Sequence, residues 1–132
     1  ALFAAEALPE DVTLERIILL GAAVAPEYDP RKALGRCRRG IVSYYSERDW
    51  FMLGWGTRTF GTMERVRSDA AGRRGFRDFT GELLVLPGFE QVAWRTEWAR
   101  LGNDGSHNGW MSRAWAREVL AREIIAVPEA VP

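Results

Sequence analysis

Three short apolar runs constrain the fold of this chain more than any other feature of its sequence. Arg16–Leu20 and Ile41–Tyr45 are rich in β-branched, aliphatic and aromatic residues and are too short to form ordinary helices. A third extended run lies between Leu83 and Trp94; Pro87-Gly88 interrupts it, so Gln91–Trp94 is its better strand candidate. Runs without polar alternation are typical of parallel strands that are covered on both faces.

Helices are expected before, between and after these strands. Ala1–Leu8 contains strong helix formers with apolar residues at helical spacing. Asp29 can cap a short helix that has Pro30 at its first position and ends near Gly40. An amphipathic helix is predicted from Ser112 to about Ile125, with an apolar side formed by Trp115, Val119, Leu120 and Ile124. Because parallel neighbours need crossover connections, this order predicts an α/β fold with a three-stranded parallel sheet and about four flanking helices.

The composition excludes several classes of protein. The chain has 132 residues, of which 47% are hydrophobic, which suits one compact domain with its own core. Its 18 basic and 18 acidic residues cancel, so we expect no nucleic-acid partner, although 17 of the cations are Arg. The longest apolar stretch, Ile17–Pro26, is about half of what a membrane-spanning helix needs, so no membrane span is predicted in this segment.

Metal and cofactor sites are not indicated. Cys37 is the only cysteine, which excludes an internal disulfide and a four-thiolate metal site. His107 is the only histidine, which excludes a metal site built from several histidines. The pattern Gly54-Trp-Gly56 lacks the lysine of a phosphate-binding loop and does not join a strand to a helix, so no cofactor is expected.

Asp49 is the first candidate catalytic residue. It follows the strand Ile41–Tyr45 in the segment Tyr45-Ser-Glu-Arg-Asp49. Open α/β sheets place their ligands at the carboxyl ends of the strands, where a carboxylate could accept the Nδ1 hydrogen of an imidazole and fix its tautomer. Asp49 is also well placed to cap a helix beginning at Trp50, and its spacing alone leaves both roles open.

His107 is the second candidate, as the only side chain that could serve as a general base near neutral pH. It lies in Gly105-Ser-His-Asn-Gly109, where the flanking glycines allow tight turns and close backbone approach. A lone loop histidine is often only a surface residue. Its position beyond the third strand, and after Asp49 in the chain, favours catalysis, and we predict that the two side chains lie together at one rim of the sheet.

The nucleophile that such an acid and base would serve is not evident in the sequence. No Gly-x-Ser-x-Gly motif occurs. Ser106 follows a polar loop instead of a strand, and Ser46 is a typical turn former. Cys37 has arginine neighbours that could lower the pKa of its thiol, but it has no local histidine. None of the three is expected to be a nucleophile.

Taken together, these segments resemble the C-terminal half of an α/β-hydrolase. Glu15–Gly21, Ile41–Ser46 and Gln91–Trp94 would be its sixth, seventh and eighth strands. From about Ala4 to Ala121 the chain is similar to bacterial serine-hydrolase-like proteins, in which a Tyr-Ser-x-x-Asp segment and a glycine-flanked histidine recur. The resemblance implies that Asp49 orients His107, and that His107 activates a serine that attacks a small-molecule ester or related acyl substrate.

The resemblance also implies that this chain is part of a larger fold. The catalytic serine and the oxyanion-hole amides would lie upstream, and Ala1–Leu8, which does not begin with Met, would be the end of the helix that follows the serine. Residues 1–132 are therefore interpreted as one partial domain, from the sixth strand to the final helix. The N-terminal half of the complete domain, which would hold the nucleophile, would be the partner of this chain. The chain alone is expected to be inactive.

Two other interpretations of the sequence remain open. One is a non-catalytic α/β-hydrolase-like protein that binds a ligand or another surface. The other is a doubly wound nucleotide-binding domain in which Asp49 caps a helix and His107 is incidental. The absence of a glycine fingerprint after the first strand counts against the nucleotide-binding domain.

Overall fold

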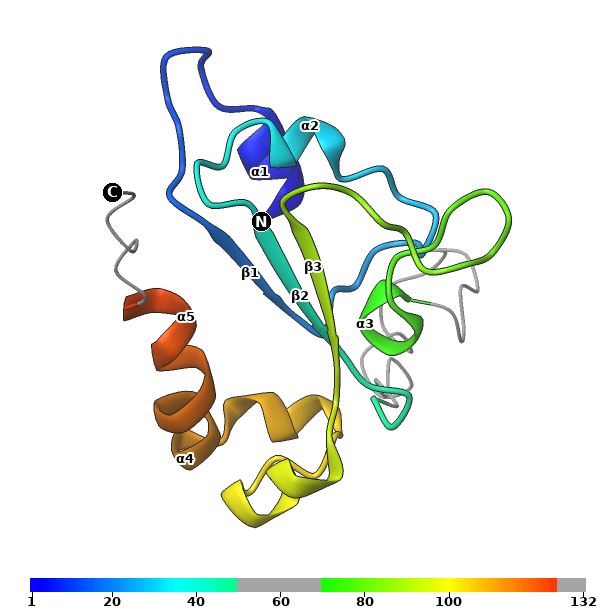
Figure 1. The fold of residues 1–132 in the computed structure, drawn as a ribbon, viewed down its shortest axis with the longest axis vertical. Coiled ribbons are helices and arrows are strands. Elements are labelled where there is room, and N and C mark those ends of the chain that lie inside the picture. Colours follow the sequence, from blue (N-terminus) through cyan, green and yellow to red (C-terminus); the bar gives the residue numbers. More distant parts are fainter. Residues whose placement is uncertain (50–69, 126–132) are drawn as a thin grey trace, which may run out of the picture.

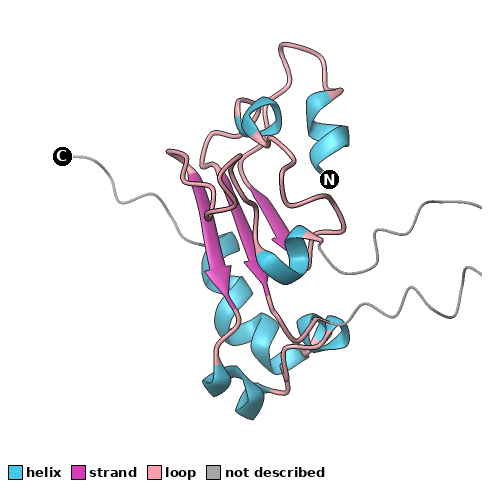
Figure 2. Cartoon of the chain, turned by 90° about the vertical axis from the view of Figure 1, so that its right-hand side faces the viewer, coloured by secondary structure: helices cyan, strands magenta, loops and turns pink. Residues whose placement is uncertain are grey.

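The fold is taken from a computed structural model, which describes residues 1–49 and 70–125. It has the predicted α/β architecture, with a three-stranded parallel sheet flanked by helices (Figure 1). The strands are β1 (Ile17–Leu20), β2 (Ile41–Tyr45) and β3 (Phe89–Ala93), in the order β1-β2-β3. In Figure 2 their arrows point the same way, so their carboxyl ends meet at one rim.

The register of the sheet explains which side chains are buried. Ile41 of the central strand pairs with Ile17 on one side and with Phe89 on the other. Because side chains alternate along a strand, these three residues point to one face of the sheet, and Val42 and Tyr44 point to the other. The first four residues of β2 are buried, as expected for a strand paired on both edges and covered on both faces.

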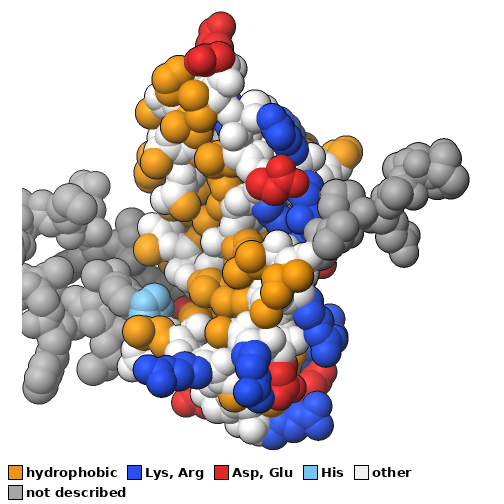
Figure 3. Space-filling model, turned by 90° about the vertical axis from the view of Figure 1, so that its left-hand side faces the viewer, with side chains coloured by type: hydrophobic (Ala, Val, Ile, Leu, Met, Phe, Trp, Pro, Cys, Tyr) orange, Lys and Arg blue, Asp and Glu red, His pale blue; other side chains and the backbone are white. Residues whose placement is uncertain are grey.

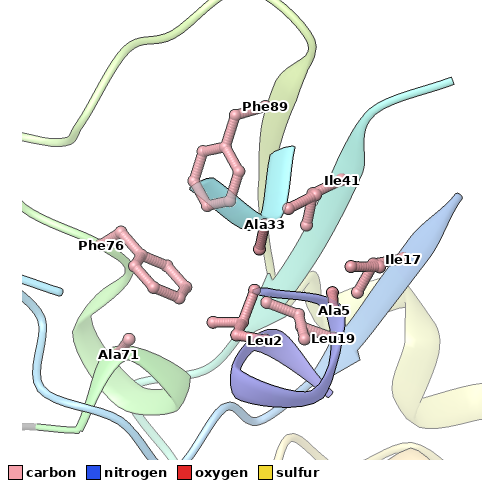
Figure 4. Packing of buried hydrophobic residues seen from close by; sticks show 9 residues of the cluster. All are labelled: Leu2, Ala5, Ile17, Leu19, Ala33, Ile41, Ala71, Phe76 and Phe89. Atoms are coloured by element: carbon pink, nitrogen blue, oxygen red, sulfur yellow. The ribbon is translucent and has the colours of Figure 1, made fainter. Parts of the chain in front are cut away.

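Three short helices cover the first face of the sheet. They are α1 (Leu2–Glu6), α2 (Arg31–Leu34) and α3 (Ala71–Arg74). Figure 4 shows the apolar cluster between these helices and the strands, which consists of Leu2, Ala5, Ile17, Leu19, Ala33, Ile41, Ala71, Phe76 and Phe89. Such burial of apolar surface is the main source of stability for a sheet face.

The C-terminal part of the chain covers the opposite face. It forms η1 (Thr96–Leu101) and η2 (His107–Met111), then the helical segment α4 (Arg113–Trp115), η3 (Ala116–Leu120) and α5 (Ala121–Ile125). The cluster on this face is aromatic and consists of Val42, Tyr44, Trp98, Trp110 and Trp115. The ring centroids of Trp110 and Trp115 are 5.3 Å apart in an edge-to-face arrangement, which aromatic pairs prefer.

A polar contact fixes the end of the C-terminal helical segment to the sheet. The hydroxyl of Tyr44 donates a hydrogen bond of 3.3 Å to Glu123, and Arg16 forms an ion pair of 2.8 Å with the same carboxylate. Burial and the neighbouring Glu123 raise the pKa of Tyr44, so its hydroxyl stays a donor at neutral pH.

Two predicted helical features are wrong in detail. The helix expected from Pro30 to about Gly40 ends at Leu34, because the following backbone turns to pair with the segment before β1. The amides of Arg38 and Arg39 donate to the carbonyls of Leu14 and Glu15 instead of continuing the helix. Ile124, expected on the apolar side of the last helix, is 67% exposed, because the core contacts of that segment come from residues further upstream.

The third strand also begins earlier than predicted. β3 starts at Phe89, directly after the Pro87-Gly88 interruption, and ends at Ala93. Gly88 supplies the reason, since its backbone has a positive φ of 77° and its carbonyl accepts the amide of Ile41. The strand therefore joins the sheet as soon as the chain leaves this turn.

Apolar side chains form much of the middle of the side of the molecule that Figure 3 faces, where β1 forms one edge of the described sheet. Arg, Lys, Asp and Glu side chains gather at the lower end, where the C-terminal helical segment lies, and further charged side chains lie at the top and at the upper right of this view. Within residues 1–49 and 70–125, none of the helices has both the length and the apolar character needed to cross a membrane.

Candidate active site

Asp49 lies in a tight turn just beyond the carboxyl end of β2. The amide of Ser46 donates to the carbonyl of Gly72, and the amide of Asp49 donates back to the carbonyl of Ser46. The Ser46 hydroxyl accepts a hydrogen bond from the amide of Arg48, so a side chain as well as the backbone stabilises this turn. This turn buries the Asp49 side chain, which is only 4% exposed.

Asp49 has two side-chain neighbours from one element, η2. The Nδ1 atom of His107 lies 3.3 Å from each carboxylate oxygen, at hydrogen-bonding distance from Oδ2. The indole Nε1–H of Trp110 donates to the same Oδ2 atom at 3.2 Å. The structure therefore brings Asp49 and His107 together at the rim formed by the carboxyl ends of the strands, where we expected them.

The loop that carries His107 is held by Asn103, which is fully buried. Its side-chain oxygen accepts the amide of Gly105, and its main-chain carbonyl accepts the indole Nε1–H of Trp94. Gly105 has a positive φ of 85°, and a Cβ there would lie 2.9 Å from the hydroxyl oxygen of Ser46. The glycine thus lets the histidine loop pack directly against the turn that carries Asp49.

The start of η2 is fixed by Asp104. Its carboxylate accepts hydrogen bonds from both the hydroxyl and the amide of Ser106, the residue before His107. These two hydrogen bonds hold the pKa of Asp104 below its ordinary value, and the bond from the Ser106 hydroxyl has the larger effect. The charged carboxylate therefore stabilises the turn from which the imidazole extends.

The two members of the pair differ in their contact with solvent. The His107 side chain is 42% exposed, whereas the carboxylate behind it is almost completely buried. A buried carboxylate next to an accessible imidazole can fix the ring in the Nδ1–H tautomer and stabilise its protonated form. This arrangement allows proton transfer at the exposed side of the ring.

The other candidate residues are engaged elsewhere. Ser106 donates its hydroxyl to Asp104, and Ser46 is buried with its oxygen accepting the amide of Arg48. The Cys37 thiol donates to the carbonyl of Ala33, and burial raises its pKa, so the lowered pKa suggested by its arginine neighbours is wrong. The predicted helix start at Trp50 and the Gly54-Trp-Gly56 pattern lie outside the described residues.

Sequence reasoning missed three residues that build this site. Trp110, Asn103 and Gly21 have no role predicted from the sequence. Gly21 follows β1 with a φ of 58°, and a Cβ there would lie 2.5 Å from Oδ2 of Asp49. The spacing of His107 and Trp110 was the available signal, since residues three apart share one side of a 3₁₀ turn.

No metal site accompanies the pair in the part of the chain that the structure describes, where no three His, Cys, Asp or Glu side chains are grouped to hold an ion. Two shallow hollows of about 270 and 260 Å³ lie beside Arg16 and beside Tyr44, and neither is lined by Asp49 or His107.

Comparisons with protein-family models, curated proteins and solved structures find no match to this chain.

Proposed function

We propose that this chain supplies the acid and the base of a Ser-His-Asp triad in a serine hydrolase of the α/β-hydrolase type. The observation that carries the proposal is the contact of 3.3 Å between Nδ1 of His107 and the buried carboxylate of Asp49. The position of this pair at the carboxyl ends of parallel strands supports it, since open α/β sheets bind their ligands there.

The chemistry follows from the burial of the Asp49 carboxylate and the exposure of the His107 ring. Asp49 holds the Nδ1–H of His107, which leaves Nε2 as the base. Nε2 takes the proton of a serine hydroxyl while the serine oxygen attacks the acyl carbon of an ester, and the imidazolium then gives this proton to the leaving alkoxide. Water repeats the sequence on the acyl-enzyme and regenerates the serine.

The nucleophile in this scheme is a serine of the full-length protein that lies upstream of Ala1. Within the described residues, the hydroxyls of Ser46 and Ser106 are held by local hydrogen bonds that maintain the turn and the start of η2. The oxyanion-hole donors belong to the same upstream part. Since one such donor is worth on the order of 3 kcal/mol or more, residues 1–132 alone should not turn over substrate.

The test uses the full-length protein that contains this chain. A fluorophosphonate probe should label its serine, and hydrolysis of a short-chain p-nitrophenyl ester should fall by on the order of 10⁴-fold in Asp49→Asn, where the wrong imidazole tautomer is favoured. His107→Ala should lose both labelling and hydrolysis. Asp29→Asn is the matched control, because it removes an exposed carboxylate that pairs with its neighbour Arg31.

Two results would contradict the proposal. A folded full-length protein that the probe leaves unlabelled would favour a non-catalytic protein that binds its ligand without hydrolysis. Labelling that persists undiminished in His107→Ala would show that another base activates the serine.

A further inference from the structure

Trp110 makes a contact that its packing role does not require. Its ring belongs to the aromatic cluster on the sheet, 5.3 Å from Trp115 and 6.3 Å from Tyr44. Its indole Nε1–H nevertheless leaves the apolar side of this cluster and donates to Oδ2 of Asp49 at 3.2 Å. Trp115 in the same cluster is completely buried, and its Nε1 has no hydrogen-bond partner in the described part of the chain, so burial alone does not produce such a bond.

The geometry of η2 explains why the same carboxylate meets two side chains. A 3₁₀ turn has three residues per turn, so side chains at positions i and i+3 lie one above the other. His107 and Trp110 occupy those positions, and both reach Asp49. The imidazole lies toward solvent, and the indole lies beneath it in the core, with 4% of Trp110 exposed.

The carboxylate needs such a donor. Burying an ionised group without hydrogen bonds costs several kcal/mol. Oδ1 of Asp49 lies 3.3 Å from Nδ1 of His107 but forms no hydrogen bond with the described residues, so the hydrogen bonds of this carboxylate are made at Oδ2. The indole can only donate, so it cannot reverse its role and compete for the imidazole hydrogen. A donor fixed by packing on one oxygen restricts rotation of the carboxylate about its Cβ–Cγ bond, which keeps both oxygens within reach of the ring.

We propose that Trp110 is a positioning residue, which holds the Asp49 carboxylate in the rotamer that accepts the Nδ1–H of His107. The catalytic meaning of this role rests on the proposed function. The geometric role does not, because it concerns the tautomer of one imidazole in the chain described here. His107 is the only histidine of residues 1–132, and the loss of its ring signals in His107→Ala assigns them in the full-length protein.

The test measures the tautomer of His107 from its imidazole ¹⁵N shifts, at a pH where the ring is neutral. Trp110 is replaced by 3-benzothienylalanine, which keeps the size and shape of the indole but has sulfur where the N–H was. We expect the ratio of the Nδ1–H to the Nε2–H tautomer to fall by on the order of tenfold, which is the effect of losing one hydrogen bond to a charged group. Trp110→Phe should also lower the ratio of the Nδ1–H to the Nε2–H tautomer.

The matched control is Trp115→Phe, which removes an indole of the same cluster whose N–H has no partner in the described part of the chain. It should leave the tautomer ratio unchanged, even if the protein loses stability. An unchanged ratio in the benzothienyl variant, whose packing is preserved, would overturn the proposal. In the full-length protein, kcat should fall with little change in KM; a shifted tautomer in a protein without hydrolase activity would uphold the positioning role and reject the hydrolase.

Discussion

Gly72 in α3 packs directly against the backbone of Gly21, the residue that follows β1. A Cβ on Gly72 would lie 2.3 Å from the carbonyl carbon of Gly21 and 2.6 Å from the amide nitrogen of Ala22. Two hydrogen bonds pass through the same residue, from the Gly72 amide to the Ala22 carbonyl and from the Ser46 amide to the Gly72 carbonyl. This one glycine therefore joins the segment after β1 to the turn that carries Asp49.

Gly72→Ala should destabilise the fold through overpacking. The new methyl group would meet backbone atoms that cannot rotate away, so we expect a loss of about 1–3 kcal/mol or more in the free energy of unfolding, measured by urea denaturation. Gly35→Ala is the matched control, because its Cβ would meet only ordinary contacts at 3.5 Å and its φ is −62°. That control should be neutral or stabilising by about 0.4–1 kcal/mol. Equal losses in both variants would show that the close approach is unimportant.

Gly21→Ala should damage the site as well as the fold. Its φ of 58° costs an alanine about 1–2 kcal/mol, and its Cβ would lie 2.5 Å from Oδ2 of Asp49. We therefore expect the carboxylate to move away from Trp110, which NMR would detect as faster solvent exchange of the Trp110 indole N–H. Gly81→Ala carries a similar backbone strain at a φ of 84°, but among the described residues beyond its two chain neighbours nothing lies within 4 Å of its Cβ. It should show the loss of stability without the change at Trp110.

Asn103→Ala should loosen the histidine loop. The substitution removes the acceptor of the Gly105 amide and leaves that amide without its side-chain partner. We expect a loss of about 1–3 kcal/mol in the free energy of unfolding and faster hydrogen exchange at Gly105. Asn108→Ala, in the same loop but exposed, should change neither measurement. Unchanged exchange at Gly105 in the Asn103 variant would contradict the assigned role.

The sequence predicted the fold well where local pattern and tertiary packing agree. Ile41–Tyr45 was predicted with its correct bounds, because a continuous apolar run suits a strand covered on both faces. α3 was not predicted, because Ala71–Arg74 contains a glycine and shows no periodicity. Its position is set by hydrogen bonds to Ala22 and Val24, which are distant in sequence.

The site was predictable in part for a similar reason. Asp49 and His107 could be placed at one rim, since the carboxyl ends of parallel strands meet there. The three-residue spacing from His107 was the only sequence signal for Trp110, and Gly21 had none, because an indole in an apolar segment and a glycine after a strand have many ordinary explanations. Only the three-dimensional packing shows that both lie within contact distance of one carboxylate oxygen.

Asp104 should make the stability of the histidine loop depend on pH. Its pKa lies below the ordinary value in the folded protein, chiefly through the Ser106 hydroxyl, so the ionised form stabilises the fold. This contribution is fully present above about pH 4, and it is lost as the pH falls through the lowered pKa and the carboxylate gains a proton in both states. We expect Asp104→Ala to cost about 0.5–1 kcal/mol at pH 7, a modest value because the group is largely exposed to solvent.

The measurement is urea denaturation of the wild-type protein and Asp104→Ala between pH 7 and pH 2. The difference between their free energies of unfolding should be constant from pH 7 to about pH 5 and should shrink below about pH 4, because only the wild type loses a charged acceptor there. Asp104→Asn is the control, since its amide oxygen can still accept the Ser106 hydrogens but carries no titrating charge. Its difference from Asp104→Ala should not vary with pH. A wild-type advantage that persists undiminished at pH 2 would mean that the carboxylate acts by shape and hydrogen bonding alone, so that its charge adds nothing to the turn that positions His107.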